Sequence, residues 1–436
     1  MDSFKERSSN SMIGKKIHNL CKQLLPLNRS LTGKGNRQTL KILKGICGNL
    51  KIKEVPSGKK VFDWTIPDEW NANNAWIKCP DGKKIAIYKK NNLHLVSYSK
   101  KMNTKMSLNQ LEKNLHYLKD QPNAIPYVTS YYNRNWGFCM TYNQRKKLIK
   151  GTYEVFIDST FSKGSLTYGE ILIPGIEKKE IFLSTYICHP SMANNELSGI
   201  TVTIFLAKWL MEQKRRYSYR LIFIPETIGS INYLSTNIKI LKKKVIAGFN
   251  ITCVGDNRSY SYIPSRKGDT LADKIGLHVI KNIDKNFFRY TWLNRGGDER
   301  QYCSPGVDLP IASIIRTKYG SYKEYHTSLD DLKNVVTPEG LDGGYNLIKK
   351  ALEALENNFY YKNTSLCEPQ MSKRGMYPNI GKKDISKEIK NMMNTLSYCD
   401  GNNSLIDISE KLKLPFWKIL PLIKILLKEK IIKKLR

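Results

Sequence analysis

The stretch IFLSTYICHPSMANNELSG, residues 181–199, decides the fold of this chain. Its apolar run from Ile181 to Ile187 predicts a strand buried on both faces, as the strands of parallel sheets are. The run ends at His189, so a histidine stands at the carboxyl end of a central strand, where open α/β sheets bind their ligands. A polar group and then an apolar helix follow: Asn194, Asn195, Glu196 and Ser198, and residues 200–214. Such a group is compatible with a capped βα loop or with a functional site.

Strands and helices alternate along the chain from residue 152 onward. Runs rich in apolar residues predict strands over 153–158, 166–173, 181–187, 221–225, 246–254 and 311–315. Amphipathic periodicity predicts helices over 200–214, 230–240, 269–280 and 341–357. The alternation predicts an α/β fold with a mostly parallel sheet and helices on both faces.

Residues 71–148 have a different texture, with short alternating runs broken by turn residues. Runs at 75–78, 84–88 and 94–98 predict hairpin strands, and a helix is expected over 107–118. We interpret this segment as a small β-rich module inserted into the larger domain. Its many aromatic residues are more typical of a small core than of a surface that stacks bases or sugars. The turn at 26–35, before the module, is interpreted as a connector rather than a loop near a site.

The C-terminal part predicts a winged-helix type of domain after a polar linker. Helices are expected over 385–397, 405–412 and 416–428, and a strand over 431–435. Pro421 lies inside the third helix and is expected to bend it. That helix offers lysines but no arginine, asparagine or glutamine to read bases, which favours protein or intramolecular packing over DNA recognition.

Composition indicates a globular protein of two or three domains, with 436 residues, 41% of them apolar and 25% charged. No apolar run is long enough to span a bilayer, and the N-terminal residues lack the apolar region of a secretory signal. The nine cysteines are scattered and form no CxxC pair. We therefore expect reduced thiols and a cytoplasmic location.

A net charge of +34 is the most unusual property of the composition. Such a charge can indicate a nucleic-acid partner. The excess is mostly lysine, however, and it is spread over the whole chain rather than gathered in one block. A compositional bias that aids solubility is favoured, so no nucleic-acid partner is predicted.

Four residues follow strands or lie in loops of the α/β region: His189, Glu226, Asp256 and His326. The first three come directly after apolar runs, so all four could open on one edge of one sheet. Two imidazoles and two carboxylates are a ligand set suited to Zn²⁺, and a zinc hydrolase also needs a carboxylate as base. Each residue alone has an ordinary structural explanation. Together, in the order His, Glu, Asp, His, they favour a metal site with Glu226 as the base.

The remaining histidines look structural, with His18, His116 and His278 on helices and His94 on a strand.

The strings around these residues resemble the zinc aminopeptidases of the M28 type. They are ICHPSMANNELSG, PETIGSI, GGDERQYCSPG and YHTSLD, with NRSLTGKGNRQTL, VFDWTIPDEW, NLHLVSYS and YVTSYYNRNWGFC. More narrowly, they resemble a bacterial group of aminopeptidase-like proteins formerly known only as domains of unknown function. The resemblance covers nearly the whole chain. It implies a phosphorylase/hydrolase-like core over 1–65 and 155–368, an inserted β-rich domain over 66–154 and a winged-helix-like domain over 369–436.

Carried over by position, the resemblance implies that His189, Asp256 and His326 are metal ligands and that Glu226 is the general base. Two departures bear on the metal count. Asn195 stands where the dinuclear enzymes have a bridging aspartate, with Glu196 able to serve only after a shift of one residue. The sequence Glu226-Thr227 replaces a pair of adjacent carboxylates. We therefore expect one zinc ion, with a second weak or absent.

The segment GGDERQY, residues 296–302, is the remaining motif. Asp298, Glu299 and Arg300 could hold a charged group of a substrate, or form a salt-bridged turn. Asn195, Glu196, Asp298 and Arg300 are thus candidate metal or substrate contacts.

The first functional hypothesis is a zinc-dependent hydrolase that cleaves a peptide or other amide bond with metal-activated water and Glu226 as base. The alternative is a peptidase-like scaffold that binds a ligand or partner without turnover. Relatives of this kind are associated with surface-polysaccharide biosynthesis, so the amide could be carried by a modified sugar. The expected partner is a small peptide or amide-bearing substrate, and the sequence leaves homo-oligomerisation open.

Overall fold

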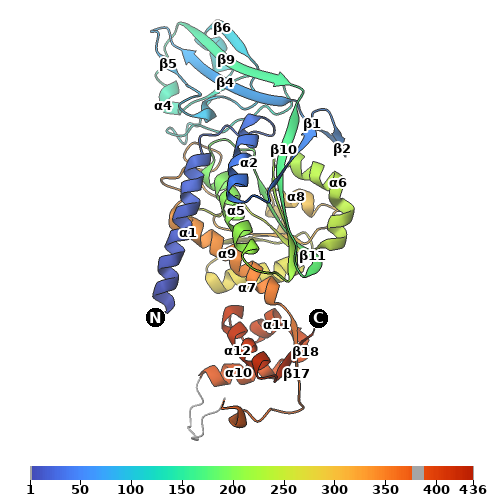
Figure 1. The fold of residues 1–436 in the computed structure, drawn as a ribbon. Helices are drawn as coiled ribbons and strands as arrows, with labels where there is room; N and C mark the ends of the chain where they lie inside the picture. The colour runs from blue at the N-terminus through green and yellow to red at the C-terminus, as the bar shows by residue number, and fades with distance from the viewer. Residues whose placement is uncertain (1, 376–386, 436) are drawn as a thin grey trace. The chain divides into compact units, whose positions relative to one another are not determined.

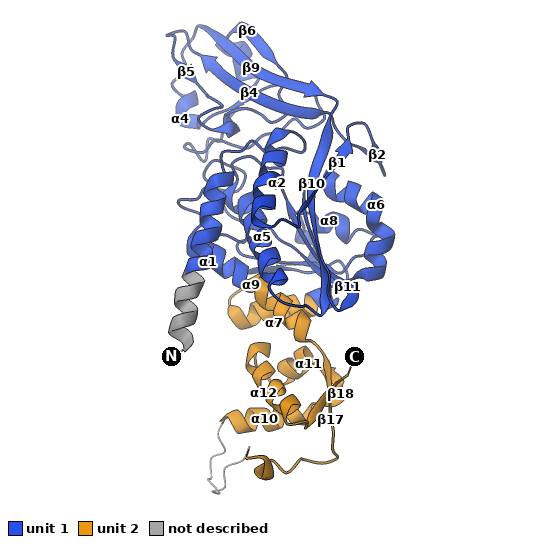
Figure 2. Ribbon diagram, in the orientation of Figure 1, with its two compact units in different colours: residues 1–272, 288–346 blue, residues 273–287, 347–436 orange. Residues whose placement is uncertain are grey.

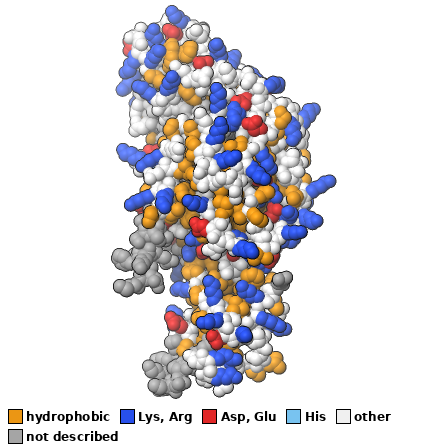
Figure 3. All heavy atoms as spheres, in the orientation of Figure 1, with side chains coloured by type: hydrophobic (Ala, Val, Ile, Leu, Met, Phe, Trp, Pro, Cys, Tyr) orange, Lys and Arg blue, Asp and Glu red, His pale blue; other side chains and the backbone are white. Residues whose placement is uncertain are grey.

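A computed structural model describes residues 2–375 and 387–435, with side chains from Met12 onward. The chain divides into two units (Figure 2): residues 1–272 with 288–346, and residues 273–287 with 347–436. In the part of the chain that is described, no helix is both long and apolar enough to cross a membrane. Lysine and arginine side chains are scattered over the face shown in Figure 3.

An eight-stranded mixed sheet forms the centre of the first unit (Figure 1). Its order is β1 (Lys51–Pro56), β10 (Ser165–Ile173), β12 (Tyr217–Ile224), β11 (Glu177–Tyr186), β13 (Val245–Asn250), β16 (Ile311–Ile315), β14 (Ser261–Ile263) and β15 (Phe288–Arg289). The four strands β12, β11, β13 and β16 are parallel neighbours, and β1 and β10 pair antiparallel with theirs. Strand β14 pairs antiparallel with β16 and parallel with β15. The α/β prediction is confirmed, with its parallel part at the middle of the sheet.

Helices cover both faces of this sheet (Figure 1). On one face lie α1 (Asp2–Leu24), α2 (Lys34–Ile46) and α5 (Ser198–Met211), and on the other lie α6 (Ile228–Lys244) and the short α8 (Glu299–Tyr302). Helix α5 is apolar all round and almost wholly buried, as a helix between a sheet and further helices should be. Gly199 lets it approach the sheet closely, because a Cβ there would lie 2.5 Å from the carbonyl oxygen of Ile251.

The inserted segment forms a four-stranded antiparallel sheet, in the order β5 (Lys84–Ile85), β4 (Glu69–Lys78), β9 (Thr152–Ser162) and β6 (Met102–Ser107). The strand predicted over 153–158 is present, but as β9 it belongs to this sheet and not to the large one. The strand expected over 94–98 is absent, since a 3₁₀ turn at Asn92–His94 and isolated bridges occupy that region. The polar strand β6 was not predicted, because its apolar positions are only two methionines.

Smaller elements complete this region. They are the hairpin β2 (Lys60–Val61) and β3 (Trp64–Thr65), the pair β7 (Leu115–His116) and β8 (Phe138–Cys139), and the helices α3 (Leu108–Glu112) and α4 (Tyr142–Arg145). The helix expected over 107–118 ends at Glu112, so His116 lies on a strand rather than on a helix.

The second unit has the three helices and small sheet of a winged helix. The sheet has the order β18 (Asp400–Ser404), β17 (Tyr360–Asn363) and β19 (Ile432–Leu435), and the helices are α10 (Lys387–Ser397), α11 (Leu405–Lys411) and α12 (Phe416–Lys428). The start of α10 predicted at residue 385 lies outside the described residues. Ser404 and Asp407 form a capping box that begins α11. Most of α7 (Leu271–Ile283) belongs to this unit, and α9 (Pro338–Asn357) runs from the first unit into the second.

Candidate active site

His189 lies just beyond the end of β11, and both of its ring nitrogens face carboxylates. Its Nδ1 lies 2.8 Å from Oε2 of Glu196, and its Nε2 lies 3.6 Å from Oε2 of Glu226. Burial, together with the charge of Arg29, lowers the pKa of His189 to about 3, so the ring is neutral. A neutral ring that donates from Nδ1 to Glu196 keeps a lone pair on Nε2, the form in which histidine binds metals.

Glu226 comes after β12, the strand that pairs with β11, and this places its side chain beside His189. Its backbone N–H donates to Sγ of Cys188 at 3.3 Å, and its Oε1 accepts from Nη2 of Arg300, also at 3.3 Å. Burial and the nearby charge of Asp298 raise the pKa of Glu226 well above its usual range, while Arg300 opposes the shift. The next residue, Thr227, has a φ of 64°, a strained value for a β-branched residue. Its burial and the charges around it therefore give Glu226 a carboxyl group that can both hold and release a proton.

His326 brings the second imidazole to the same place. The two histidine rings lie 5.3 Å apart between centroids, and Tyr325 stacks on His326 at 3.9 Å. The backbone at His326 has a φ of 56°, and its carbonyl accepts from the N–H of Tyr127 at 2.8 Å. Burial, followed by the influence of His189, lowers the pKa of His326 to about 3. This ring too is neutral and able to act as a ligand.

Asn195 lies next to His326, with its side-chain nitrogen 3.4 Å from Nε2 of that ring. The residue is buried, and its Oδ1 has no hydrogen-bond partner among the described residues. A buried oxygen without a protein partner is open to water, an ion or a ligand. The amide is held in position from behind, since Asp330 accepts from the backbone N–H groups of Asn194 and Asn195 at 2.7 and 3.0 Å.

Asp256 is not brought together with the histidines in this way. Its carboxylate accepts from the Asn194 side chain at 3.0 Å, from the Arg258 N–H at 2.9 Å, and from the N–H and hydroxyl of Thr317 at 3.0 and 2.6 Å. Both oxygens are thus occupied in joining three loops. Within residues 12–375 and 387–435, the one trio of potential ligands with all atoms within 4.8 Å is Cys188, His189 and Glu196.

A fully buried ion pair supports His189 from behind. Arg29 and Glu196 both have side chains that are 0% exposed, and Nε of Arg29 lies 3.7 Å from Oε1 of Glu196. The same guanidinium donates to the carbonyl oxygens of His189 at 3.1 Å and of Leu24 at 2.7 Å. The turn at 26–35, predicted as a connector, therefore supplies a charged residue to the site. Composition alone gave no signal for this contact, which spans 160 residues of sequence.

The GGDERQY motif supports the Glu226 loop. Oδ1 of Asp298 accepts from the Thr227 N–H at 2.8 Å and from the Ser230 hydroxyl at 2.9 Å, and burial raises the pKa of Asp298 to about 7. Oε1 of Glu299 accepts from the N–H groups of Gly296 and Gly297, at 2.9 Å each. Asp298 and Glu299 are buried, and Arg300 is the member of the motif that lines a pocket beside Glu226.

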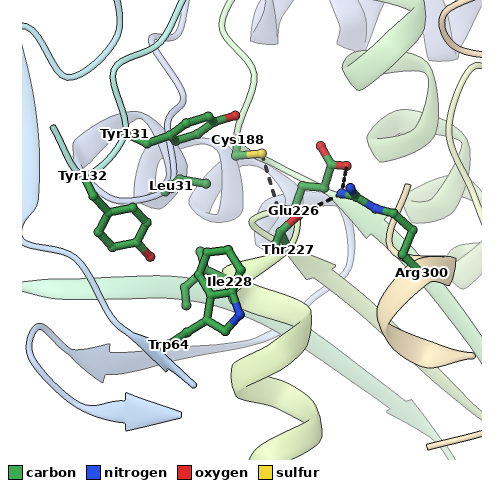
Figure 4. Close-up of a pocket in the computed structure, with 9 residues that line it drawn as sticks. All are labelled: Leu31, Trp64, Tyr131, Tyr132, Cys188, Glu226, Thr227, Ile228 and Arg300. Atoms are coloured by element: carbon green, nitrogen blue, oxygen red, sulfur yellow. Dashed lines mark hydrogen bonds and ion pairs between the residues drawn. The ribbon is translucent and has the colours of Figure 1, made fainter. Parts of the chain in front are cut away.

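A pocket of about 410 Å³ opens beside Glu226 (Figure 4). Aromatic rings stand along one side and the pair of Glu226 and Arg300 along the other. Its lining comes from both the large sheet and the inserted segment: Leu31, Trp64, Tyr131, Tyr132, Cys188, Glu226, Thr227, Ile228 and Arg300. An apolar pocket with a few convergent polar groups is the usual form of a binding site.

Residues 18–358 match the protein family described as "Domain of unknown function (DUF4910)". The chain belongs to this family. Residues 359–434 match a winged helix-turn-helix family.

Relatives of this DUF4910 protein cover most or all of the chain. A Clostridium acetobutylicum protein named "Putative polysaccharide biosynthesis protein with aminopeptidase-like domain" is 43% identical over 413 residues, 94% of each chain. The crystal structure of a "putative peptidase" from the same organism superposes with a TM-score of 0.92 and 40% identity, covering 100% of this chain and 99% of the other. A zinc aminopeptidase from Bacillus subtilis has a TM-score of 0.57 at 12% identity, with 78% of this chain and 94% of the other covered. The likeness to the last of these shows a shared fold.

Proposed function

We propose that this DUF4910 protein is a zinc-dependent hydrolase of the aminopeptidase type that cleaves an amide bond in the pocket beside Glu226. The observation that carries the proposal is the meeting of two imidazoles, His189 and His326, with Glu226 and the side-chain amide of Asn195. The shared fold with zinc aminopeptidases and the aminopeptidase-like naming of the Clostridium relative support it.

We propose a site for one zinc ion. Nε2 of His189, Nε2 of His326 and Oδ1 of Asn195 would hold it, since a 180° turn of the Asn195 amide exchanges its nitrogen and oxygen beside His326. Three protein ligands and one open position are typical of catalytic zinc. Asp256, expected as a ligand, is left out of this set because its oxygens already bond to Asn194 and Thr317. A neutral Asn195 and a neutral Thr227 leave too few carboxylates for a second tightly held ion.

When bound, zinc would polarise the scissile carbonyl group and acidify water at its open position. Glu226 would accept the water proton on Oε2, the oxygen that faces His189, while Arg300 holds Oε1. A cation nearby favours the ionised carboxylate and so counteracts the raised pKa of Glu226. Glu226 would then return the proton to the leaving amine. Glu196 keeps His189 in the tautomer that presents Nε2.

Hydrolysis of a panel of aminoacyl amides and N-acyl amino sugars by the zinc-loaded protein tests this proposal. We expect turnover that falls by about 10²–10⁴-fold in Glu226→Gln, the usual contribution of a general base, with zinc still bound. Equal turnover by wild type and Glu226→Gln would refute the role of Glu226.

The alternative is a scaffold that binds the same kind of ligand without turnover. The neutral residues Asn195 and Thr227 favour it, because each removes a negative charge from the candidate metal site. Ligand binding that is unaffected by zinc, with no hydrolysis of any amide in the panel, would favour this alternative.

A further inference from the structure

The pocket beside Glu226 has an unusual wall of half-exposed aromatic rings (Figure 4). Trp64, Tyr131 and Tyr132 are 40%, 44% and 47% exposed. Trp64 comes from the β2–β3 hairpin, and the two tyrosines come from a loop of the inserted segment. The Tyr132 hydroxyl donates to the carbonyl of Thr65 at 3.2 Å, and the Trp64 and Tyr132 rings lie 6.3 Å apart. The two elements thus hold their rings together at the mouth of the pocket.

The loop backbone is strained at Tyr131, which has a φ of 44°. Non-glycine residues rarely adopt this conformation unless surrounding structure holds them there, and such positions are frequent at ligand sites. Here the turn presents two successive tyrosines, both of which line the pocket. Large apolar side chains left exposed together usually mark a binding surface.

A second pocket of about 250 Å³ has Tyr131 and Tyr132 in its lining, as the first pocket does. Tyr98 and Phe161 line this pocket, with ring centroids 6.3 Å apart, and Tyr98 lies 6.5 Å from Tyr131. Tyr98 is only 2% exposed, so it supports the neighbouring rings from within the protein. We call the four rings that remain accessible, Trp64, Tyr132, Tyr131 and Phe161, the aromatic groove.

Charged side chains border the far end of the aromatic groove. Asp68 pairs with Arg134 at 2.7 Å and with Lys163 at 3.0 Å, and all three line the second pocket. The Arg134 guanidinium lies 3.7 Å from the centre of the Phe161 ring. Arg134 thus covers one face of Phe161, and the region combines the remaining ring surface with donors and acceptors for several hydrogen bonds.

That combination matches the chemistry of a sugar chain. A pyranose ring has an apolar C–H face, which covers an aromatic ring, and a rim of hydroxyl groups, which bonds to charged planar side chains. An apolar amino-acid side chain would instead favour a closed pocket that removes its surface from water. Two adjacent pockets that share a tyrosine pair suit two neighbouring units of one chain.

We propose that the aromatic groove binds an oligosaccharide and that the amide presented to Glu226 is the N-acyl group of an amino sugar. The substrate class rests on the proposed hydrolase function, but binding in the groove does not. The polysaccharide-biosynthesis naming of the Clostridium relative is consistent with this ligand.

Calorimetric titration of the Glu226→Gln protein in EDTA tests the groove without zinc or turnover. The probes are N-acetylglucosamine oligomers of one to four units and, for comparison, tripeptides. We expect the trimer to bind at least about tenfold more tightly than the monomer, because it fills both pockets, and more tightly than any tripeptide. Trp64→Ala and Tyr132→Ala should each weaken trimer binding by about tenfold or more.

Phe62→Ala is the matched control, since Phe62 lies on the same hairpin, is 66% exposed and lines neither pocket. It should change the affinity by less than about twofold, and circular dichroism should show all three variants folded. Tripeptides binding as tightly as the trimer, or groove variants that behave like Phe62→Ala, would overturn the proposal. Amide hydrolysis without binding of any oligomer would refute only the proposed substrate class. Binding of the trimer without uptake of zinc would refute only the proposed hydrolase function.

Discussion

Replacing Arg29 by methionine removes the positive charge behind His189 while keeping a long side chain of similar reach. In the native structure, Arg29 and Glu196 are both 0% exposed, and their closest charged atoms are 3.7 Å apart. The variant leaves Glu196 in the protein interior beside His189 and Cys188, without its cation. It also leaves the carbonyl oxygens of Leu24 and His189 without their arginine donor.

The expected cost follows from these contacts. Breaking a buried ion pair by removing one partner typically destabilises a protein by about 3–5 kcal/mol, because the other charge stays buried and uncompensated. Adding Glu196→Gln removes that charge, and the glutamine oxygen can still accept from Nδ1 of His189. The double variant should therefore be less destabilised than the sum of the two single variants by about 1–3 kcal/mol.

Guanidinium unfolding followed by tryptophan fluorescence measures these differences. Six of the seven tryptophans lie in the first unit, with Trp417 in the second, so the signal reports mainly on the unit that holds the site. Lys78→Met is the control, since Lys78 and Glu154 form an exposed pair at 3.8 Å that should be worth at most about 1 kcal/mol. An Arg29→Met variant no less stable than Lys78→Met, or additive single variants, would refute the reasoning.

Three further predictions concern other parts of the chain. Gly199→Ala should lower stability by about 1–3 kcal/mol, because its Cβ would lie 2.5 Å from the Ile251 carbonyl oxygen; an unchanged denaturation midpoint would contradict this. Burial lowers the pKa of His278 in spite of its contact with Glu410. Below about pH 6.5, His278 therefore binds a proton more readily in the unfolded chain than in the folded second unit. The melting temperature of that unit should therefore fall as the pH drops from about 7 to 5, and His278→Gln should flatten the slope; an equal slope in the variant would rule out His278. Asn195→Asp should tighten zinc binding at least about tenfold by adding a negatively charged ligand, as measured by chelator competition, and weaker binding would show that Asn195 does not face the metal.

The fold was largely predictable because hydrophobic periodicity reports burial. The run Ile181–Ile187 and its neighbours gave the central strands, since a strand covered on both faces must be apolar throughout. Residues 153–158 show where this reasoning stops. Their apolar content predicted a strand, but which sheet the strand joins depends on its pairing with β4 and β6, and pairing partners are not encoded in local periodicity.

The sequence predicts those residues of the candidate site whose positions follow from the ends of neighbouring strands. His189 and Glu226 follow adjacent parallel strands, so their proximity follows from the sheet. Asp256 follows a strand too, but an irregular turn separates it from β13, with a φ of 49° at Cys253, and its carboxylate bonds to Thr317. Arg29 was missed because its contact with His189 is set by tertiary packing.

Zinc binding by matched histidine variants tests the central proposal most directly. Metal content by mass spectrometry and affinity by chelator competition should give about one zinc per chain for the wild type. His189→Gln and His326→Gln should each weaken binding by at least about tenfold, because each removes a proposed ligand. His116→Gln, which alters a histidine of the inserted segment on β7, should bind like the wild type. Zinc retained at full affinity when both His189 and His326 are replaced, or no zinc bound by the wild type after zinc is supplied, would contradict the account.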